Sequence, residues 1–191
     1  MKLVFATGNA HKLKEISSKL SGEIELISMR EIGFVGEIEE TGTTLEQNAL
    51  LKAEYISNNF NIDCFADDTG LEIAALNGKP GVYSARFAGE NCSFEDNVNK
   101  TLSLMAGKEN RKACFRTIIC HLSGNETTYF EGKIEGEITT EVQGKDGFGY
   151  DPIFRPNGFD KTFAEMTLAE KNEISHRAIA VNKLVSFLSK S

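Results

Sequence analysis

The chain has 191 residues, 40% of them hydrophobic and 26% charged, and a net charge of −7 at pH 7. This length fits one domain or two closely joined lobes with a real core, and the composition is ordinary for a globular protein. The negative charge argues against a nucleic-acid partner, because proteins that follow phosphate backbones carry a basic stripe. An anionic small molecule stays possible where Lys and Arg side chains converge and a metal ion helps.

The cysteines and apolar runs suggest where the protein works. Four cysteines form neither a C-x-x-C pair nor a zinc spacing, and Cys64, Cys114 and Cys120 lie in strand-like runs. Buried free thiols are therefore predicted at these three positions. The longest apolar runs span only a few residues, so we expect no signal peptide and no membrane partner. A reducing, cytoplasmic location follows as the expectation.

The first strand and helix meet at a glycine-containing turn. Residues 3–6 are apolar and predict a buried strand, which Thr7-Gly8-Asn9 interrupts. A helix is expected from about His11, with Asn9 as its N-cap. Such a turn favours phosphate binding, because free backbone N–H groups and the helix dipole would face the anion and Lys12 adds charge. An ordinary capped helix start is the alternative interpretation.

A second helix carries a lysine on its apolar face. It follows an acidic segment at residues 37–40. Thr44 and Gln47 have capping-box spacing, and the helix is expected to continue to about Asn58. Lys52 falls within about 20° of the apolar stripe on the helical wheel. A buried lysine is costly unless its side chain reaches solvent or meets an anion, and both explanations are open.

Two adjacent aspartates follow a buried apolar run. Residues 65–70 read Phe-Ala-Asp-Asp-Thr-Gly, and the apolar part predicts a strand end. Asp-Asp-Thr-Gly is typical of turns. The alternative is a carboxylate that binds Mg²⁺ or orients a water. Since adjacent side chains on an extended backbone point to opposite faces, we expect only one of Asp67 and Asp68 to enter a given site. Residues 71–76 look strand-like.

The next segments predict a helix and a pair of strands. Ser93 and Asp96 form an expected capping box for a helix that stops at Gly107. Residues 112–122 are largely apolar on both faces, which predicts a central strand. Residues 127–138 are its expected antiparallel partner.

The last third contains an aromatic loop and a cationic helix start. The small neighbours of Phe148 in the loop 147–152 would let its ring lie flat against a base. A loop aromatic that anchors a core is the alternative. His176 and Arg177 lie near the start of the last helix, where cations oppose the helix dipole. An anionic or electron-rich ligand would offset that cost, while solvated surface residues are the alternative.

These features together suit a nucleoside triphosphate bound with Mg²⁺. Five sequence blocks, in order and at matching spacing, also closely resemble the inosine/xanthosine triphosphate pyrophosphatase family over nearly the whole chain. The blocks are Thr7 to Lys12 (TGNAHK), Ala66 to Leu71 (ADDTGL), Pro80 to Arg86 (PGVYSAR), Gly147 to Phe154 (GFGYDPIF) and Ser175 to Arg177 (SHR).

The resemblance implies an α/β fold, in which an elongated mixed β-sheet is flanked by helices and two lobes enclose a nucleotide cleft. It implies a single nucleotide pyrophosphatase domain over residues 1–191 that forms a homodimer and needs Mg²⁺. Such enzymes hydrolyse the non-standard purine nucleotides ITP, dITP and XTP to the monophosphate and pyrophosphate. They thereby remove damaged purines from the nucleotide pool.

The resemblance also assigns roles to residues. Asp68 would be the catalytic base and a metal-linked carboxylate, and either Glu39 or Glu40 would help bind Mg²⁺. Phe148 would stack on the base. The implied substrate-binding residues are Thr7, Gly8, Asn9, Ala10, His11, Lys12, Lys52, Thr69, Phe148, Gly149, Tyr150, Asp151, Lys171, His176 and Arg177.

The implied mechanism is attack of water on the α-phosphorus with pyrophosphate leaving. Lys171, His176 and Arg177 would read the base, because a 6-oxo purine offers an acceptor where adenine presents an amino donor. Rival interpretations are a pyrophosphatase for dTTP or modified pyrimidines, against which the GFGYDPIF and SHR blocks argue, and a non-catalytic nucleotide-binding regulator, against which the acidic set argues. A scaffold role would leave Lys52 unexplained.

Overall fold

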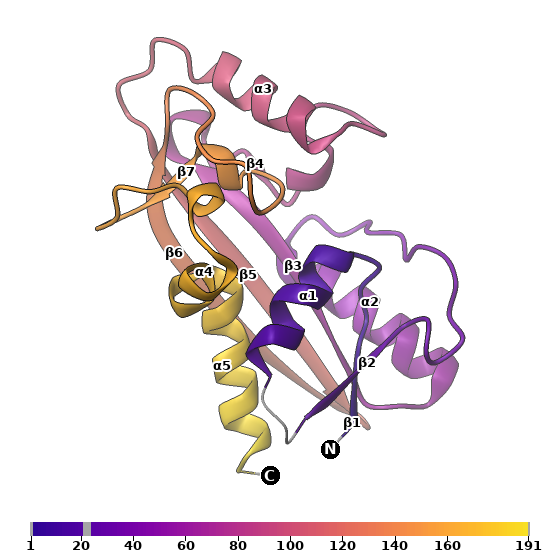
Figure 1. Cartoon of the computed structure of the whole chain (residues 1–191). Helices are drawn as coiled ribbons and strands as arrows, with labels where there is room; N and C mark the ends of the chain where they lie inside the picture. The colour runs from indigo at the N-terminus through magenta and orange to yellow at the C-terminus, as the bar shows by residue number, and fades with distance from the viewer. Residues whose placement is uncertain (1, 21–23, 191) are drawn as a thin grey trace. The chain divides into compact units, whose positions relative to one another are not determined.

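The computed structural model describes residues 2–20 and 24–190, and Figure 1 shows its elements. The chain forms two compact units. Unit 1 comprises Met1–Asp68, Thr117–Gly132 and Arg177–Ser191, and unit 2 comprises Thr69–Arg116 and Lys133–His176. The single domain over residues 1–191 stays a prediction, and residues 1, 21–23 and 191 lie outside the described part.

The described strands form a seven-stranded mixed sheet in the order β2-β1-β3-β5-β6-β7, with β4 paired to β3. Strand β1 runs parallel to β2 and β3, whereas the β3–β4 and β6–β7 pairs are antiparallel. The predicted α/β class with a mixed sheet is therefore confirmed. The strands are β1 (Lys2–Phe5), β2 (Glu25–Ser28), β3 (Cys64–Ile73), β4 (Pro80–Gly81), β5 (Lys112–Ser123), β6 (Glu126–Ile138) and β7 (Phe154–Pro156).

Helices flank these strands. They are α1 (Ala10–Lys19), α2 (Leu45–Phe60), α3 (Phe94–Leu104), α4 (Leu168–Ile174) and α5 (His176–Leu188). The predicted capping box of Ser93 with Asp96 is present at the start of α3. Within residues 2–20 and 24–190, every helix is too short or too polar to traverse a bilayer.

In unit 1, helices α1 and α5 share one core with the strands. Ile16 of α1 and Leu184 of α5 are buried together with Phe65 of β3. The Phe65 ring stacks on the Phe5 ring with their centroids 4.5 Å apart. Helix α2 instead packs on the neighbouring residue of β3, where the Cys64 thiol donates to the Ala53 carbonyl at 3.2 Å. Because strand side chains alternate, odd-numbered residues of this part of β3 face α1 and α5, and even-numbered ones face α2.

The core of unit 2 is rich in aromatic side chains. Phe115, Phe154 and Phe163 pack together, with ring centroids 4.7 to 6.0 Å apart. Leu71 of β3 and Val98 of α3 join the same buried cluster. Tyr150 of the aromatic loop belongs to this cluster, so the core of unit 2 anchors that loop.

Cysteines behave as the sequence predicts. Cys64, Cys114 and Cys120 are buried free thiols. Burial raises the pKa of Cys64 and Cys120 to about 12 and that of Cys114 to about 11. Thiols with such pKa values are inert at neutral pH, so these cysteines serve as small apolar core residues.

The turn interpretation of Asp67 to Gly70 is wrong. All four residues lie inside the continuous strand β3, and the aspartates are not at a strand end. The strand expected over residues 71–76 ends at Ile73, and a 3₁₀ turn covers Ala74–Leu76. Gly70 is needed for a close approach, because a Cβ on it would lie 2.6 Å from the Gly81 carbonyl oxygen of the paired strand β4.

We therefore expect Gly70→Ala to lower the free energy of unfolding by about 1–3 kcal/mol, since the added methyl must push β4 away. Gly8→Ala is the matched control, because a Cβ there meets only Met29 at 3.8 Å. Its effect should stay within about 0.5 kcal/mol. Urea unfolding of both variants beside the wild type measures the difference. Equal stability of the two variants would contradict the close-approach role.

Candidate active site

The turn between β1 and α1 is organised by Asn9, the predicted N-cap. Its Oδ1 accepts from the backbone N–H groups of His11 at 2.9 Å and Lys12 at 3.2 Å. Thr7 supports the turn, because its Oγ1 accepts from the Asn9 N–H at 3.2 Å. The expectation that these helix amides are free for an anion is wrong for His11 and Lys12, since Asn9 satisfies both. Gly8 and His11 are exposed, so the rim of the turn is accessible.

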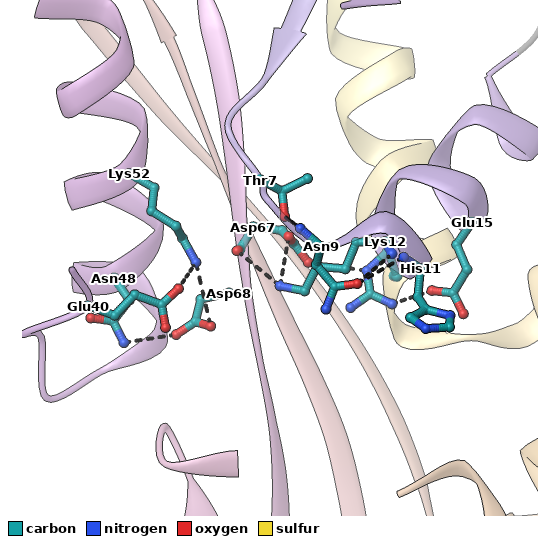
Figure 2. Close-up of polar contacts among 11 residues, drawn as sticks. Thr7, Asn9, His11, Lys12, Glu15, Glu40, Asn48, Lys52, Asp67 and Asp68 are labelled. Carbon is teal, nitrogen blue, oxygen red and sulfur yellow. Dashed lines mark hydrogen bonds and ion pairs between the residues drawn. The ribbon is translucent and has the colours of Figure 1, made fainter. Parts of the chain in front are cut away.

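Asp67 lies at the centre of a buried ion-pair network on the side of β3 that faces α1 and α5. Its Oδ1 accepts from the Lys12 ammonium at 2.9 Å (Figure 2), and its Oδ2 accepts from Arg177 Nε at 3.2 Å. Arg177 also donates through Nη1 to Glu15. Asp67, Glu15 and Arg177 are each at most 6% exposed. The four groups alternate in charge, so each buried ion has an opposite neighbour.

Asp68 belongs to a second network, on the side of β3 that faces α2. Asn48 Nδ2 donates to Asp68 Oδ2 at 3.1 Å, and the Lys52 ammonium lies 3.8 Å from Asp68 Oδ1. Lys52 also donates to Glu40, so one ammonium is shared by two carboxylates, as Figure 2 shows. The predicted divergence of the two aspartates is confirmed, and Lys52 proves to be buried because it meets anions.

The two aspartates differ in their affinity for protons. Burial would raise the pKa of Asp67, but Lys12, Arg177 and Lys52 outweigh it and hold the pKa well below its usual range. Burial dominates at Asp68 and raises its pKa above the usual value, although Lys52 and Lys12 act in the opposite direction. Asp67 is thus the more acidic of the two carboxyl groups, and Asp68 is the better proton acceptor.

The lysines are tuned by the same contacts. Burial lowers the pKa of Lys12, and the nearby cations Lys52 and Arg177 add to this effect, although Asp67 opposes it. Burial would also lower the pKa of Lys52, but Asp68 and Glu40 raise it above its ordinary value. Both lysines therefore need anionic partners to stay charged in these positions.

Glu40 and Asp68 are the acidic pair that could share a metal ion. Among residues 2–20 and 24–190, no three His, Cys, Asp or Glu side chains are arranged to hold a metal ion alone. Mg²⁺ does not need such a set, because it is usually held by one or two carboxylates together with substrate phosphates. Two carboxylates that already share one cation, the Lys52 ammonium, fit this requirement. Glu39 is exposed and lies outside this pair.

The aromatic loop of unit 2 is folded around Asp151. Its Oδ2 accepts from the Phe148 N–H at 2.8 Å and from the Lys171 ammonium at 2.7 Å. Gly147 makes room for this carboxylate, because a Cβ there would lie 2.2 Å from the same oxygen and φ is +77°. The Lys171 ammonium also lies 5.0 Å from the centre of the half-buried Phe148 ring. Asp151, Lys171 and Phe148 thus form one supported group.

The other predicted residues of unit 2 are more deeply packed. The Tyr150 hydroxyl donates to the Ser84 carbonyl at 2.8 Å, and burial raises the pKa of this phenol well above its usual value. The His176 ring is 3% exposed and stacks on Phe115 at 4.6 Å. Gly149 has a positive φ of +62°, and Thr69 is half-buried in β3. The solvated-surface interpretation of His176 and Arg177 is therefore wrong.

Sequence reasoning missed Asn48 and Glu15. Asn48 is fully buried, and it lies on the same side of α2 as Lys52, which follows it by four residues. The sequence pattern that could have identified Asn48 is a second polar residue on the apolar stripe of α2, one helical turn from Lys52. Glu15 lies one turn after Lys12 on α1, but its partner Arg177 is 162 residues away in sequence. No local pattern could identify that pair.

Each unit thus gathers its own set of predicted residues. Unit 1 brings together Thr7, Asn9, Lys12, Glu40, Lys52, Asp67, Asp68 and Arg177. Unit 2 brings together Phe148, Asp151 and Lys171, with Tyr150 and His176 packed in its core. These features define an α/β protein whose carboxylates and lysines pair beside a capped helix start, the chemistry expected of a site for a polyanion with a divalent cation.

The profile of the Ham1 family matches residues 3–187, and the chain belongs to this family. It is 52% identical to the dITP/XTP pyrophosphatase of Christiangramia forsetii over 191 residues, which cover 100% of both chains. It is 48% identical to the dITP/XTP pyrophosphatase of Bacillus subtilis over 189 residues, covering 97% of this chain and 96% of the relative. The predicted family resemblance is confirmed.

Solved structures agree with this assignment. The Staphylococcus aureus Ham1 protein superposes with a TM-score of 0.90 at 40% identity, covering 100% of this chain and 99% of that chain. A HAM1 protein from Coxiella burnetii gives a TM-score of 0.91 at 38% identity and covers 100% of both chains.

Proposed function

We propose that the protein is a Mg²⁺-dependent nucleoside-triphosphate pyrophosphatase that hydrolyses ITP, dITP and XTP to the monophosphate and pyrophosphate. The observation that carries the proposal is the buried Asp68 carboxylate, which contacts Asn48 and Lys52. The Lys52 ammonium also contacts Glu40, so the two carboxylates share it. The names of the Christiangramia forsetii and Bacillus subtilis relatives support the substrate class.

The triphosphate would be bound by the β1–α1 turn together with the half-buried Lys12 and the buried Lys52. Lys12 and Lys52 are held in place by Asp67, Asp68 and Glu40. In this mechanism the Lys52 ammonium would exchange one of its two carboxylate contacts, with Glu40 or Asp68, for a contact with the phosphates. Its positive charge would then offset the negative charge of the substrate. Gly8 and Ala10 are exposed beside the capped helix start and would contact phosphate through the backbone.

Mg²⁺ would be held by Asp68 and Glu40, and when bound it supplies neutralisation of the negative charge on the phosphates. The charges of the site favour this assignment. Its three cations, Lys12, Lys52 and Arg177, face four carboxylates, of Glu15, Glu40, Asp67 and Asp68. The protein side chains alone therefore do not offset a polyanion.

Asp68 would orient and deprotonate the attacking water at the α-phosphorus. Among the effects of the protein on this carboxyl group, burial is the largest and raises its pKa above the usual value, which favours Asp68 over Asp67 as the base. Asp67 is less suited to this role, because Lys12 and Arg177 hold its pKa below the usual range. Asp67 instead keeps Lys12 in position.

The base would be bound by the aromatic loop of unit 2. Phe148 would stack on the purine, with Lys171 supporting the ring and Asp151 fixing the loop. Donors from the Lys171 to His176 segment would meet the O6 acceptor of a 6-oxo purine. Arg177 is engaged by two carboxylates, so its predicted contact with the base would need at least one of them released. A homodimer and a cytoplasmic location complete the proposal.

The test is hydrolysis of ITP, XTP, GTP, ATP and dTTP with and without Mg²⁺, with pyrophosphate and orthophosphate measured separately. We expect Mg²⁺-dependent pyrophosphate from ITP and XTP, and at least about 100-fold lower kcat/KM for ATP, because its amino group leaves the donors of the site unpaired. Preferential cleavage of dTTP would support the pyrimidine enzyme instead. Nucleotide binding without turnover, by folded protein, would support the non-catalytic regulator.

The choice between Glu39 and Glu40 can be tested with neighbouring variants. We expect Glu40→Gln to raise the Mg²⁺ concentration needed for half-maximal activity about 10–100-fold, because one of two carboxylate ligands becomes neutral. Glu39→Gln removes the same charge at an exposed position and should shift it by no more than about twofold. Titration of activity with Mg²⁺ measures both. The reverse order would move the metal assignment to Glu39.

A further inference from the structure

Asn48 connects two parts of the proposed site through the two ends of its amide. Its Oδ1 accepts from the Gly42 N–H at 2.8 Å, and its Nδ2 donates to Asp68 Oδ2 at 3.1 Å (Figure 2). The side chain is fully buried on α2. Only one orientation of the amide satisfies both partners, because Gly42 offers a donor and the carboxylate can only accept.

Gly42 lies close to Glu40, in the long segment that joins β2 to α2. Residues 29–44 of this segment form no helix or strand. Phe34 anchors its first half by edge contacts to Tyr55 and Phe60 of α2, with centroids 5.5 and 6.4 Å apart. Near its end the Gly42 hydrogen bond to Asn48 holds the backbone two residues after Glu40.

The fit between Gly42 and Asn48 is too close for any side chain. A Cβ on Gly42 would lie 2.6 Å from Asn48 Oδ1 and 3.0 Å from the Asn48 backbone nitrogen. The loop backbone therefore lies directly against the start of α2, where the buried amide meets it. The loop that carries Glu40 and the Asp68 carboxylate are therefore both hydrogen-bonded to the buried side chain of Asn48.

We propose that Asn48 is a positioning residue that fixes the Asp68 carboxylate and the Glu40 loop relative to each other. By engaging Asp68 Oδ2, it leaves Oδ1 as the oxygen that faces the Lys52 ammonium. The inference rests on the proposed function, because a fixed distance between these carboxylates matters only if they act together on a substrate. Small displacements of catalytic groups are costly, and about 1 Å can lower the rate about 100-fold.

Two substitutions separate the two ends of the amide. Asn48→Leu has similar size and removes both hydrogen bonds, whereas Asn48→Asp keeps an acceptor for Gly42 and loses the donor to Asp68. We expect both to lower kcat for ITP about 10–100-fold while KM changes by less than about threefold, since residues that orient metal-site ligands have effects of this size. The Gly42 amide should lose its protection from hydrogen exchange in Asn48→Leu and keep it in Asn48→Asp.

Gln47→Ala is the matched control. Gln47 is the residue before Asn48, and it accepts from the Thr43 N–H at 2.7 Å, but it has no contact with Asp68 among its hydrogen bonds. The substitution Gln47→Ala removes this hydrogen bond and should loosen the same end of the loop that carries Glu40. We nevertheless expect its kcat to stay within about threefold of wild type. An equal loss of kcat in Gln47→Ala would show that Asn48 acts only by keeping the loop folded.

A double variant tests whether Asn48 acts through Asp68. In the Asp68→Asn background, adding Asn48→Leu should lower the rate by a clearly smaller factor than it does in the wild type, because one of the two groups that Asn48 positions is already inactive. Full additivity of the two losses would overturn the proposal, and so would wild-type kcat in folded Asn48→Leu or Asn48→Asp. Absence of ITP hydrolysis by the wild type would instead be a failure of the proposed function, which this outcome distinguishes.

Discussion

Asp68→Asn is expected to lower kcat for ITP by about 10³-fold while the protein stays folded. Asparagine keeps an oxygen that can accept from Asn48 Nδ2, so the buried position remains hydrogen-bonded. It cannot accept a proton, however, and it leaves Glu40 as the one anion beside Lys52 in that network. Steady-state kinetics with ITP and saturating Mg²⁺ measure the loss, and urea unfolding should show a change within about 1 kcal/mol.

Asp160→Asn is the control for this substitution, because it makes the same chemical change at an exposed position of unit 2. Its kcat should lie within about twofold of wild type. If Asp68→Asn kept wild-type kcat, the base would have to be another group, and the raised pKa of Asp68 would reflect burial alone. A loss confined to KM would instead make Asp68 a binding residue.

Arg177→Leu is expected to have the largest effect on stability, lowering the free energy of unfolding by about 3–5 kcal/mol. Removal of the guanidinium takes one ion pair from Glu15 and one from Asp67, in positions that are at most 6% exposed. Urea unfolding of the variant measures the loss. Lys161→Met breaks a solvent-exposed pair with Glu170 and should cost no more than about 1 kcal/mol. Equal losses would contradict the buried network.

The same network predicts how stability depends on pH. Burial alone would raise the pKa of Asp67, but Lys12 and Arg177 outweigh it and depress the folded-state value. A depressed carboxyl pKa contributes stability above the unfolded-state value of about 4, and this contribution is lost as pH falls below it. Unfolding between neutral pH and about pH 3 should therefore show stability declining below about pH 4, and less steeply in Arg177→Leu than in wild type. Parallel declines would show that other carboxylates dominate.

Local chemistry made some of the site predictable. The Asn9 cap and the Ser93 capping box depend on side chains two or three residues from the amides they bind, so spacing alone identifies them. Lys52 was noticeable because a charge on an apolar stripe needs a reason, and Glu40 and Asp68 supply it. Helix α2 extends to Phe60, two residues beyond the expected end.

Long-range contacts made the rest unpredictable from sequence. Asp-Asp-Thr-Gly has the local preferences of a turn, but pairing with β4 and the ions on both sides of β3 keep it extended. Asp67 has partners 55 and 110 residues away, and no pattern of spacing connects them. Arg177 shows the same limit, because its position at a helix start predicts an anionic or electron-rich partner but does not identify Glu15 and Asp67, which are 162 and 110 residues away.

The central claim is that unit 1 directs water to the α-phosphorus of a nucleoside triphosphate. The most direct test is hydrolysis of ITP with Mg²⁺ in water enriched in oxygen-18, followed by mass spectrometry of both products. We expect one labelled oxygen in the inosine monophosphate and none in the pyrophosphate, because the bond broken lies between the α-phosphorus and the bridging oxygen. Label in the pyrophosphate, or release of labelled orthophosphate, would place the attack at another phosphorus and contradict the role given to Asp68.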